Sequence, residues 1–420
     1  MEYRALGTTE EVCHISQDSA YGHGMLVALA QFTCEQLSVK KLQAAIKCLQ
    51  QSQPLLRACI EKKGIGHYLM IDSKVRQTPL QVIERKDGEQ WKKELENQLN
   101  LRLKNNEYQW RMLLLNNPRN NTHELLLTIN YSIADSFSVA ALFNSLWQLY
   151  DNPEIMLVSH RLQPPVETHL THLKKTMQLP PTDFLLTPMP YDQSNPVTKR
   201  RTRTECIAVP ANVTKRVIAF CNKQDMSEDA LFNALMLKAL AQTFNKTIST
   251  YQHTLINLRP FCEPPIISNY LSSCASLLTT YHQTAPNTSL QELANQFKQQ
   301  HNKDNITLDA LLPIIPDVYK GHAMVITHSV MGLLMGNDRF SMGPMVSNIG
   351  QITVSGDNNS IHWQSLYFGN SQQAATIPVA LNIALFHDHY MMSLSYTQPM
   401  LAEETAQLFI ANFMGLMKTL

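Results

Sequence analysis

The stretch INYSIADSFSVAALFNSLWQLY, residues 129–150, shows how this chain passes from a strand into a helix. A hydrophobic strand runs into a short turn and reaches Asp135, and an amphipathic helix begins directly after it. The apolar residues of that helix share one face, at Val139, Leu142, Phe143, Leu146 and Leu149. Taken alone, the turn is explained by helix capping, because the side chain of Asp135 or Ser136 can accept a hydrogen bond from the first helical turn.

Strand and helix signals alternate on both sides of this stretch. Before it we expect a strand at 25–32, a helix after Ser38, a hairpin around KKGIG, a helix at 90–103, and the strands YQWRMLLL and HELLLTIN. After it we expect helices at 213–222, 227–244, 290–300 and 402–420. Strands are expected at 252–258 and 275–281, and in QITVSG, SIHWQSLYFG and YMMSLSYT. The pattern predicts an α/β protein built from two halves of similar style.

A proline-rich segment separates the two halves. Seven prolines and the basic run KRRTR (199–203) fall between residues 162 and 209. We therefore predict an N-terminal subdomain at 1–161, a crossover linker at 162–209 and a C-terminal subdomain at 210–420. The basic run is interpreted as a solvated loop, with binding of an anionic ligand such as a nucleotide phosphate as the alternative.

The composition excludes several classes of protein. The chain has 420 residues, of which 44% are hydrophobic and 16% charged, so it can bury a large core. Its formal net charge of +1 argues against nucleic acid or an anionic membrane as the main partner. No apolar run reaches the ~18 residues of a membrane span, and the first residues lack the apolar core of a signal peptide. We expect a cytoplasmic protein with eight reduced cysteines, while export without a cleaved signal stays open.

Common catalytic motifs are missing from the sequence. It contains no GxxxxGKS/T, GxGxxG, GxSxG or HExxH, which argues against P-loop NTPases, dinucleotide enzymes, α/β-hydrolases and zincins. His387, Asp388 and His389 could bind a metal, but an edge or loop cluster also explains them. We therefore expect no metal and no permanently bound cofactor.

Four segments in order give the chain a resemblance to the condensation-domain superfamily of acyltransferases. Residues 130–136, NYSIADS, lie where that family has HHxxxDG between a strand and a helix. SQPLLRACI (52–60) resembles its hPLLRa strand, LINLRPFCEPP followed by SNYLSS resembles its dlRp…GN segment, and MVSNIGQI (345–352) resembles its vSNlG segment. The resemblance covers nearly the whole chain. It implies an α/β fold of two chloramphenicol-acetyltransferase-like subdomains, in a V-shaped arrangement with a tunnel between them.

The family's motif is degenerate in this chain. Its second histidine is the catalytic base of the family, and Tyr131 stands in that place. Asn130 replaces the first histidine and Ser136 the glycine, whereas Asp135 is kept. A histidine base works because its pKa of about 6.5 lies near neutral pH, but a tyrosine, with a pKa of about 10, stays protonated. Tyr131 can still donate a hydrogen bond to a thioester carbonyl or an oxyanion, or it can simply fill the space.

The resemblance also implies roles for residues outside the motif. In the family the motif aspartate pairs with the arginine of the hPLLR strand, which implies a buried, bidentate pair between Arg57 and Asp135. Arg259 is implied to face the substrate channel, although a surface or loop salt bridge also explains it. Asn348 is implied to lie near the tunnel, although a turn residue fits as well. The full implied substrate-binding set is Ser136, Arg259, Ser347 and Asn348.

Two functions are compatible with these residues. The first is an acyltransferase, with Tyr131, Asp135 and Asn130 as its catalytic group, that moves an acyl group from a thioester to an alcohol or amine acceptor. The thioester would be acyl-CoA or an acyl group on the phosphopantetheine of a carrier protein. A free amine can attack with little help from a base. The alternative is a catalytically inactive condensation-domain protein that binds a partner protein or a pantetheine-type ligand.

Overall fold

The computed structural model describes residues 2–64, 66–173, 185–301, 339–354 and 361–420, so residues 174–184 of the predicted crossover lie outside the described part. The first half forms β1 (Glu2–Ala5), α1 (Thr8–Ser19), β2 (Met25–Thr33), α2 (Val39–Ser52), β3 (Ala58–Lys63), β4 (Gly66–Ile71), β5 (Leu80–Glu84), α3 (Gln90–Asn100), β6 (Trp110–Asn116), β7 (Thr122–Asn130) and α4 (Ser136–Asp151). The second half forms β8 (Arg201–Ala208), α5 (Ala211–Lys223), α6 (Glu228–Thr243), β9 (Ile248–Asn257), β10 (Ala275–Thr284), α7 (Leu290–Gln300), β11 (Met345–Gln351), β12 (His362–Asn370), β13 (Val379–Phe386), β14 (His389–Gln398) and α11 (Glu403–Lys418).

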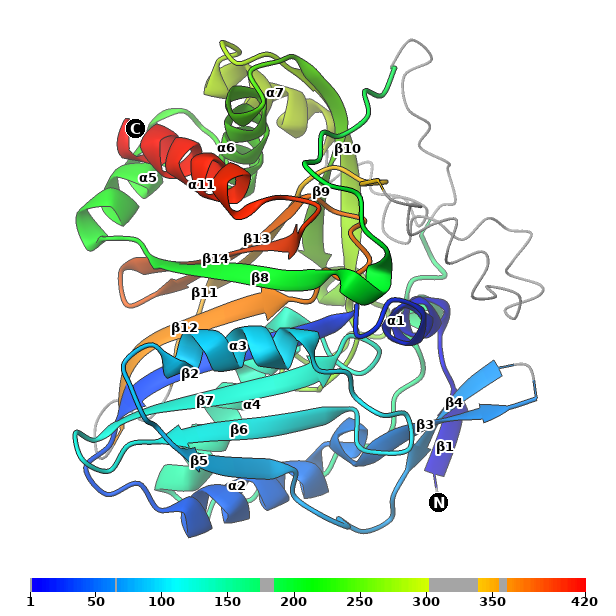
Figure 1. The fold of residues 1–420 in the computed structure, drawn as a ribbon. Coiled ribbons are helices and arrows are strands. Elements are labelled where there is room, and N and C mark those ends of the chain that lie inside the picture. Colours follow the sequence, from blue (N-terminus) through cyan, green and yellow to red (C-terminus); the bar gives the residue numbers. More distant parts are fainter. Residues whose placement is uncertain (1, 65, 174–184, 302–338, 355–360) are drawn as a thin grey trace.

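The first large sheet has the strand order β12-β2-β7-β6-β5, with only β5 and β6 parallel. Helix α3 covers one face and α4 the other (Figure 1). The α4 side holds an aromatic cluster in which the Phe32 and Trp363 rings each lie 4.9 Å from the Trp147 ring. Ser38 caps α2 and Asp135 caps α4, as their positions before the apolar periodicity predict. A smaller sheet, β1-β4-β3, lies beside this half.

The second large sheet has the order β10-β9-β11-β13-β14-β8, in which β11 runs parallel to both of its neighbours. Helices α5, α6, α7 and α11 lie on its outer side (Figure 1). Val346, Leu381 and Leu394 point to that side and join the helices in one core. Because strand side chains alternate, the residues between them point to the opposite face, which we call the inner face. Met391 on the inner face packs in the core of the first half, so this face is turned towards the first sheet.

Two strands cross the boundaries predicted from the sequence. Strand β12 follows β11 in the chain but pairs with β2 of the first sheet, with Trp363 opposite Phe32 and Asn370 opposite Leu26. Strand β8 lies within the predicted linker and forms the edge of the second sheet. The division into 1–161, 162–209 and 210–420 stays a prediction about folding units, and each large sheet draws residues from outside its own range.

Local differences from the predicted elements have simple causes. Pro54–Arg57 forms a 3₁₀-helix rather than the start of a strand, since a proline in its first turn favours helical backbone. The strand expected in QITVSG begins earlier and ends at Gln351. His387 and Asp388 form the turn between β13 and β14, with φ of 44° and 57°. In the described ranges, no group of three or more His, Cys, Asp or Glu side chains is arranged to hold a metal ion, and no helix is long and apolar enough to cross a membrane.

Two buried histidines in the second sheet make stability sensitive to acid. Burial lowers the pKa of His253 and His282 from 6.5 to about 4. The unfolded chain takes up these protons near pH 6.5 and the folded chain only near pH 4, so the stabilisation is complete above pH 6.5 and is lost as the pH falls. Between those two pH values, we expect each histidine to lower the free energy of unfolding by about 1.4 kcal/mol for each pH unit of acidification. Urea unfolding measures the free energy of unfolding at pH 7 and at pH 5. The difference between the two values should be smaller for His282→Gln than for the native protein, and equal differences would contradict this prediction.

Candidate active site

The turn after β7 begins at Asn130, whose side chain forms its hydrogen bonds within the first half. Asn130, the last residue of β7, is fully buried and donates from Nδ2 to Gln17 Oε1 (2.8 Å) and Gln109 Oε1 (3.2 Å). Its Oδ1 accepts from the Ser132 N–H at 2.9 Å. The Asn130 side chain, predicted to be catalytic, therefore holds the turn through contacts within the first half.

Tyr131 lies next to β12, which we call the exchanged strand because it follows β11 in the chain but pairs with β2 of the first sheet. Its hydroxyl donates to Oδ1 of Asn370, the last residue of β12, at 2.9 Å. Burial raises the pKa of Tyr131, so the phenol stays protonated throughout the neutral range. The buried Ser136 hydroxyl is close enough to the phenol to oppose part of that rise in pKa. The arrangement fixes a neutral hydroxyl at the place of the family's base, and the sequence gives no sign of its partner Asn370.

Asp135 is the best-connected side chain of the motif. Its Oδ1 accepts from the Ser138 N–H at 2.7 Å, which caps α4. Its Oδ2 accepts from the Arg259 guanidinium at 2.9 Å and from the Cys274 N–H at 2.8 Å. Both members of the ion pair are buried, with side-chain exposures of 1% for Asp135 and 6% for Arg259. One carboxylate thus joins the α4 N-terminus to two segments of the second half.

The prediction of an ion pair between Arg57 and Asp135 is wrong. The Arg57 guanidinium instead donates to the backbone oxygens of Asp72 (3.1 Å) and Ser73 (3.4 Å). Because Arg57 ends a 3₁₀-helix, its side chain leaves in a different direction from that of a strand residue. Arg259, for which the resemblance implies a role in substrate binding, is the arginine that forms the ion pair with Asp135.

Residues 262–274 form the other side of this junction. Ser272 Oγ accepts from Arg259 at 2.9 Å, and the Ser272 carbonyl accepts from the Ser138 hydroxyl at 3.3 Å. The SQPLLR segment does contact these residues, but through Gln53, which donates to the Asn269 carbonyl (2.8 Å) and accepts from the Leu271 N–H (3.1 Å). Gln53 was missed because the arginine of that segment was the more obvious polar group.

The two residues predicted from the vSNlG-like segment point to opposite faces of the second sheet. Asn348 donates to Asp229 of α6 at 2.9 Å and accepts from the Gly350 N–H at 3.0 Å, so it faces the outer helices. Ser347 is fully buried on the inner face, towards the first half. Of this pair, only Ser347 lies on the side where Tyr131 and Asp135 are found.

His23 is a further histidine close to the motif turn. It precedes Gly24, whose carbonyl accepts from the Tyr131 N–H at 3.0 Å. Burial lowers the pKa of His23 to about 4, so the imidazole is neutral at pH 7 but weakly basic. General-base catalysis is most effective with a pKa near the working pH, so His23 is a poor replacement for the missing base.

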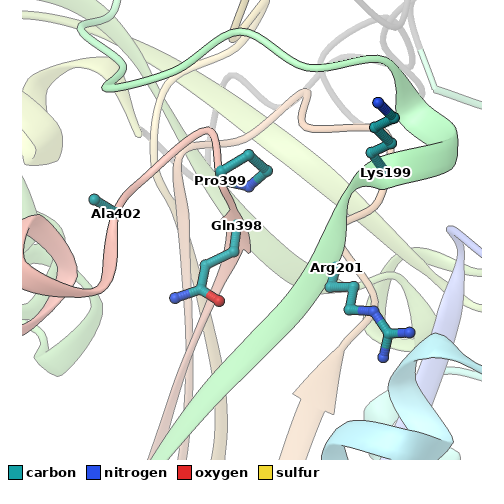
Figure 2. Close-up of a pocket in the computed structure, with 5 residues that line it drawn as sticks. All are labelled: Lys199, Arg201, Gln398, Pro399 and Ala402. Atoms are coloured by element: carbon teal, nitrogen blue, oxygen red, sulfur yellow. The ribbon is translucent and has the colours of Figure 1, made fainter.

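The basic run KRRTR lies at a separate surface pocket. This pocket of about 270 Å³ is lined by Lys199, Arg201, Gln398, Pro399 and Ala402. Figure 2 shows the Lys199 amine and the Arg201 guanidinium pointing away from each other. Arg203 of the same run is bound to Glu96 of α3 at 2.5 Å. The pocket contains no residue of the predicted site, and its two cationic groups do not converge on one anion.

Comparison with known proteins identifies the architecture. No family model and no curated protein matches the sequence. Solved structures match over nearly the whole chain: polyketide synthase associated protein 5 from Mycobacterium tuberculosis has 16% identity and a TM-score of 0.69, covering 99% of this chain and 97% of that one. Trichothecene 15-O-acetyltransferase from Fusarium sporotrichioides has 12% identity and a TM-score of 0.72, covering 99% and 94%. The epimerization domain from the third module of tyrocidine synthetase B has 12% identity and a TM-score of 0.68, covering 100% and 96%.

These neighbours carry different reactions in their names, so the shared architecture does not itself select one of them. The resemblance first seen in four short segments extends to the whole three-dimensional structure. This chain has the α/β fold of condensation domains and chloramphenicol-acetyltransferase-like acyltransferases.

Proposed function

We propose that this protein is an acyltransferase that takes an acyl thioester into a tunnel between its two halves and passes the acyl group to an amine or alcohol. The observation that carries the proposal is the junction at Asp135. Its carboxylate keeps the α4 cap, the Arg259 ion pair and the Cys274 N–H together, so the turn bearing Tyr131 is held between the halves. The donor is acyl-CoA or an acylated carrier protein.

The state of Tyr131 favours an amine acceptor. The amine nitrogen attacks the thioester carbonyl carbon, the C–S bond breaks, the thiol leaves, and the amine proton passes to solvent. No step needs a side chain to take that proton, because an unprotonated amine is already nucleophilic. A phenol whose pKa is raised by burial stays neutral and cannot act as a base.

Thiol release from a panel of acyl-CoAs tests this proposal. We expect turnover with primary amines and at least tenfold less with alcohols, since general-base assistance is worth about 10²–10⁴-fold. The rate should rise with pH as the amine loses its proton, without an inflection near pH 6–7 from the protein. An inflection there, or equal rates with alcohols, would show that another side chain acts as the base.

A binding protein without catalysis is the second candidate. The observation that favours it is the bond from the Tyr131 hydroxyl to Asn370, which occupies the phenol proton that a substrate would need. This candidate predicts that neither the native protein nor Tyr131→His releases thiol with any acceptor. Both proteins should bind a pantetheine-type ligand or a carrier protein with the same affinity.

A further inference from the structure

Among the buried polar side chains that have no hydrogen-bond partner in the described part of the chain, two lie side by side on the inner face of the second sheet. Ser347 of β11 and Asn382 of β13 are neighbours in register on the inner face of the second sheet. Their exposures are 0% and 1%. Within the described ranges, Ser347 Oγ and both Asn382 amide atoms, Oδ1 and Nδ2, have no hydrogen-bond partner. Native proteins rarely leave such groups unpaired, since each costs about 1–3 kcal/mol.

The pair lies between the two parts of the candidate site. On one side, Asn382 adjoins Ser393 of β14, whose hydroxyl donates to the Phe368 carbonyl of β12. Phe368 is two residues before Asn370, the partner of Tyr131. On the other side, Ser347 adjoins Leu255 of β9. Two residues further along that strand, Asn257 Oδ1 accepts from Arg259, which holds Asp135.

The surroundings select a neutral ligand group. The row across the inner face consists of Leu277, Leu255, Ser347, Asn382, Ser393 and Cys206, which are all uncharged. An asparagine amide offers two donors and an acceptor, and a serine hydroxyl offers one donor and accepts as well. A ligand group that pairs with all of these atoms must both accept and donate hydrogen bonds, and an amide does so through its carbonyl oxygen and its N–H.

We propose that Ser347 and Asn382 bind an amide group of the substrate. This inference rests on the proposed function and names the chemistry of the ligand at that same site. The amide can come from the pantetheine arm of the thioester, which contains two amides, or from an acceptor that carries one. Asn382 is a residue that the sequence analysis did not include in the site. It is the one polar side chain in the otherwise apolar strand VALNIALF.

Calorimetric binding with two probes distinguishes the two sources. S-Methylpantetheine represents the donor arm without a reactive thiol, and N-acetylethylenediamine represents an amide-bearing amine acceptor. We expect Asn382→Leu to weaken one of them by about tenfold or more, and Ser347→Ala to weaken the same probe less. Asn412→Leu, on the far helix α11, should leave both affinities unchanged. The affected probe identifies the source of the amide.

The proposal is overturned if the native protein binds neither probe or if Asn382→Leu binds both as the native protein does. Because binding needs no turnover, a protein that binds S-methylpantetheine but releases no thiol would refute the acyltransferase function and keep the amide site.

The melting temperature provides a second test, because it distinguishes an asparagine that binds a ligand from one that stabilises the fold. Asn233 of α6 is equally buried but bonded, donating to the Asp229 carbonyl (2.7 Å) and accepting from Thr254 Oγ1 (3.2 Å). Asn233→Leu should lower the melting temperature by several degrees. Asn382→Leu should leave it unchanged or raise it, because an unpaired polar group is exchanged for an apolar one of similar size. A fall as large as that of Asn233→Leu would show that Asn382 has a purely structural role.

Discussion

Replacing Arg259 by alanine is expected to lower the free energy of unfolding by about 3–5 kcal/mol. The Asp135 carboxylate would stay buried and lose its cationic partner at 2.9 Å. Its remaining donors, the N–H groups of Ser138 and Cys274, cannot neutralise a full negative charge. Urea unfolding followed by tryptophan fluorescence measures the change, and Asp135→Asn in the Arg259→Ala background should recover part of it because the unpaired charge is removed.

Arg57→Ala is the matched control for this experiment. In the part of the chain that the structure describes, the Arg57 guanidinium donates to backbone carbonyls at the edge of a surface groove, so the loss should be about 1 kcal/mol. The ranking of the two variants decides between the predicted and the observed partner of Asp135. A larger loss for Arg57→Ala than for Arg259→Ala would contradict the geometry described above.

Introducing a histidine at position 131 is expected to produce the largest gain in activity. Tyr131→His should raise thiol release with alcohol acceptors by about 10²–10⁴-fold, since it supplies the base that an alcohol needs. The pH profile should acquire an inflection at or below about 6.5, the usual pKa of histidine, because burial lowers it.

Tyr131→Phe controls for the loss of the phenol without adding a base. It should leave the alcohol rate at or below that of the native protein. If Tyr131→His folds and shows no gain with any alcohol or amine, and the native protein is also silent, the acyltransferase proposal fails and the binding protein remains.

Local patterns predicted most elements of the fold. The periodicity of α4 and the apolar strands β2 and β7 are properties of short segments, and the structure contains them where the sequence indicates. The strand exchange was missed because alternation shows that a segment such as β12 forms a strand but not which sheet it joins. The same limit applied to Asp135, whose arginine partner lies 124 residues away in the sequence.

Residues of the candidate site were predicted only where a motif marked them. Asp135 and Ser347 were found this way, whereas Gln53 and Asn370 lack any local signal, because their roles depend on contacts between distant segments. Asn382 did leave a trace, since an amide inside a fully apolar strand is unexpected. A single polar residue in an otherwise apolar strand is therefore a sequence signal for this kind of site.

The exchanged strand has a consequence for how the protein is made. Met25 at the start of β2 and Ser371 after β12 are bonded to each other although they lie 346 residues apart. While the chain is being synthesised, β2 leaves the ribosome long before its partner exists, and the first sheet has an open edge until β12 emerges. The nascent first half therefore cannot complete its sheet until β12 of the second half has been translated.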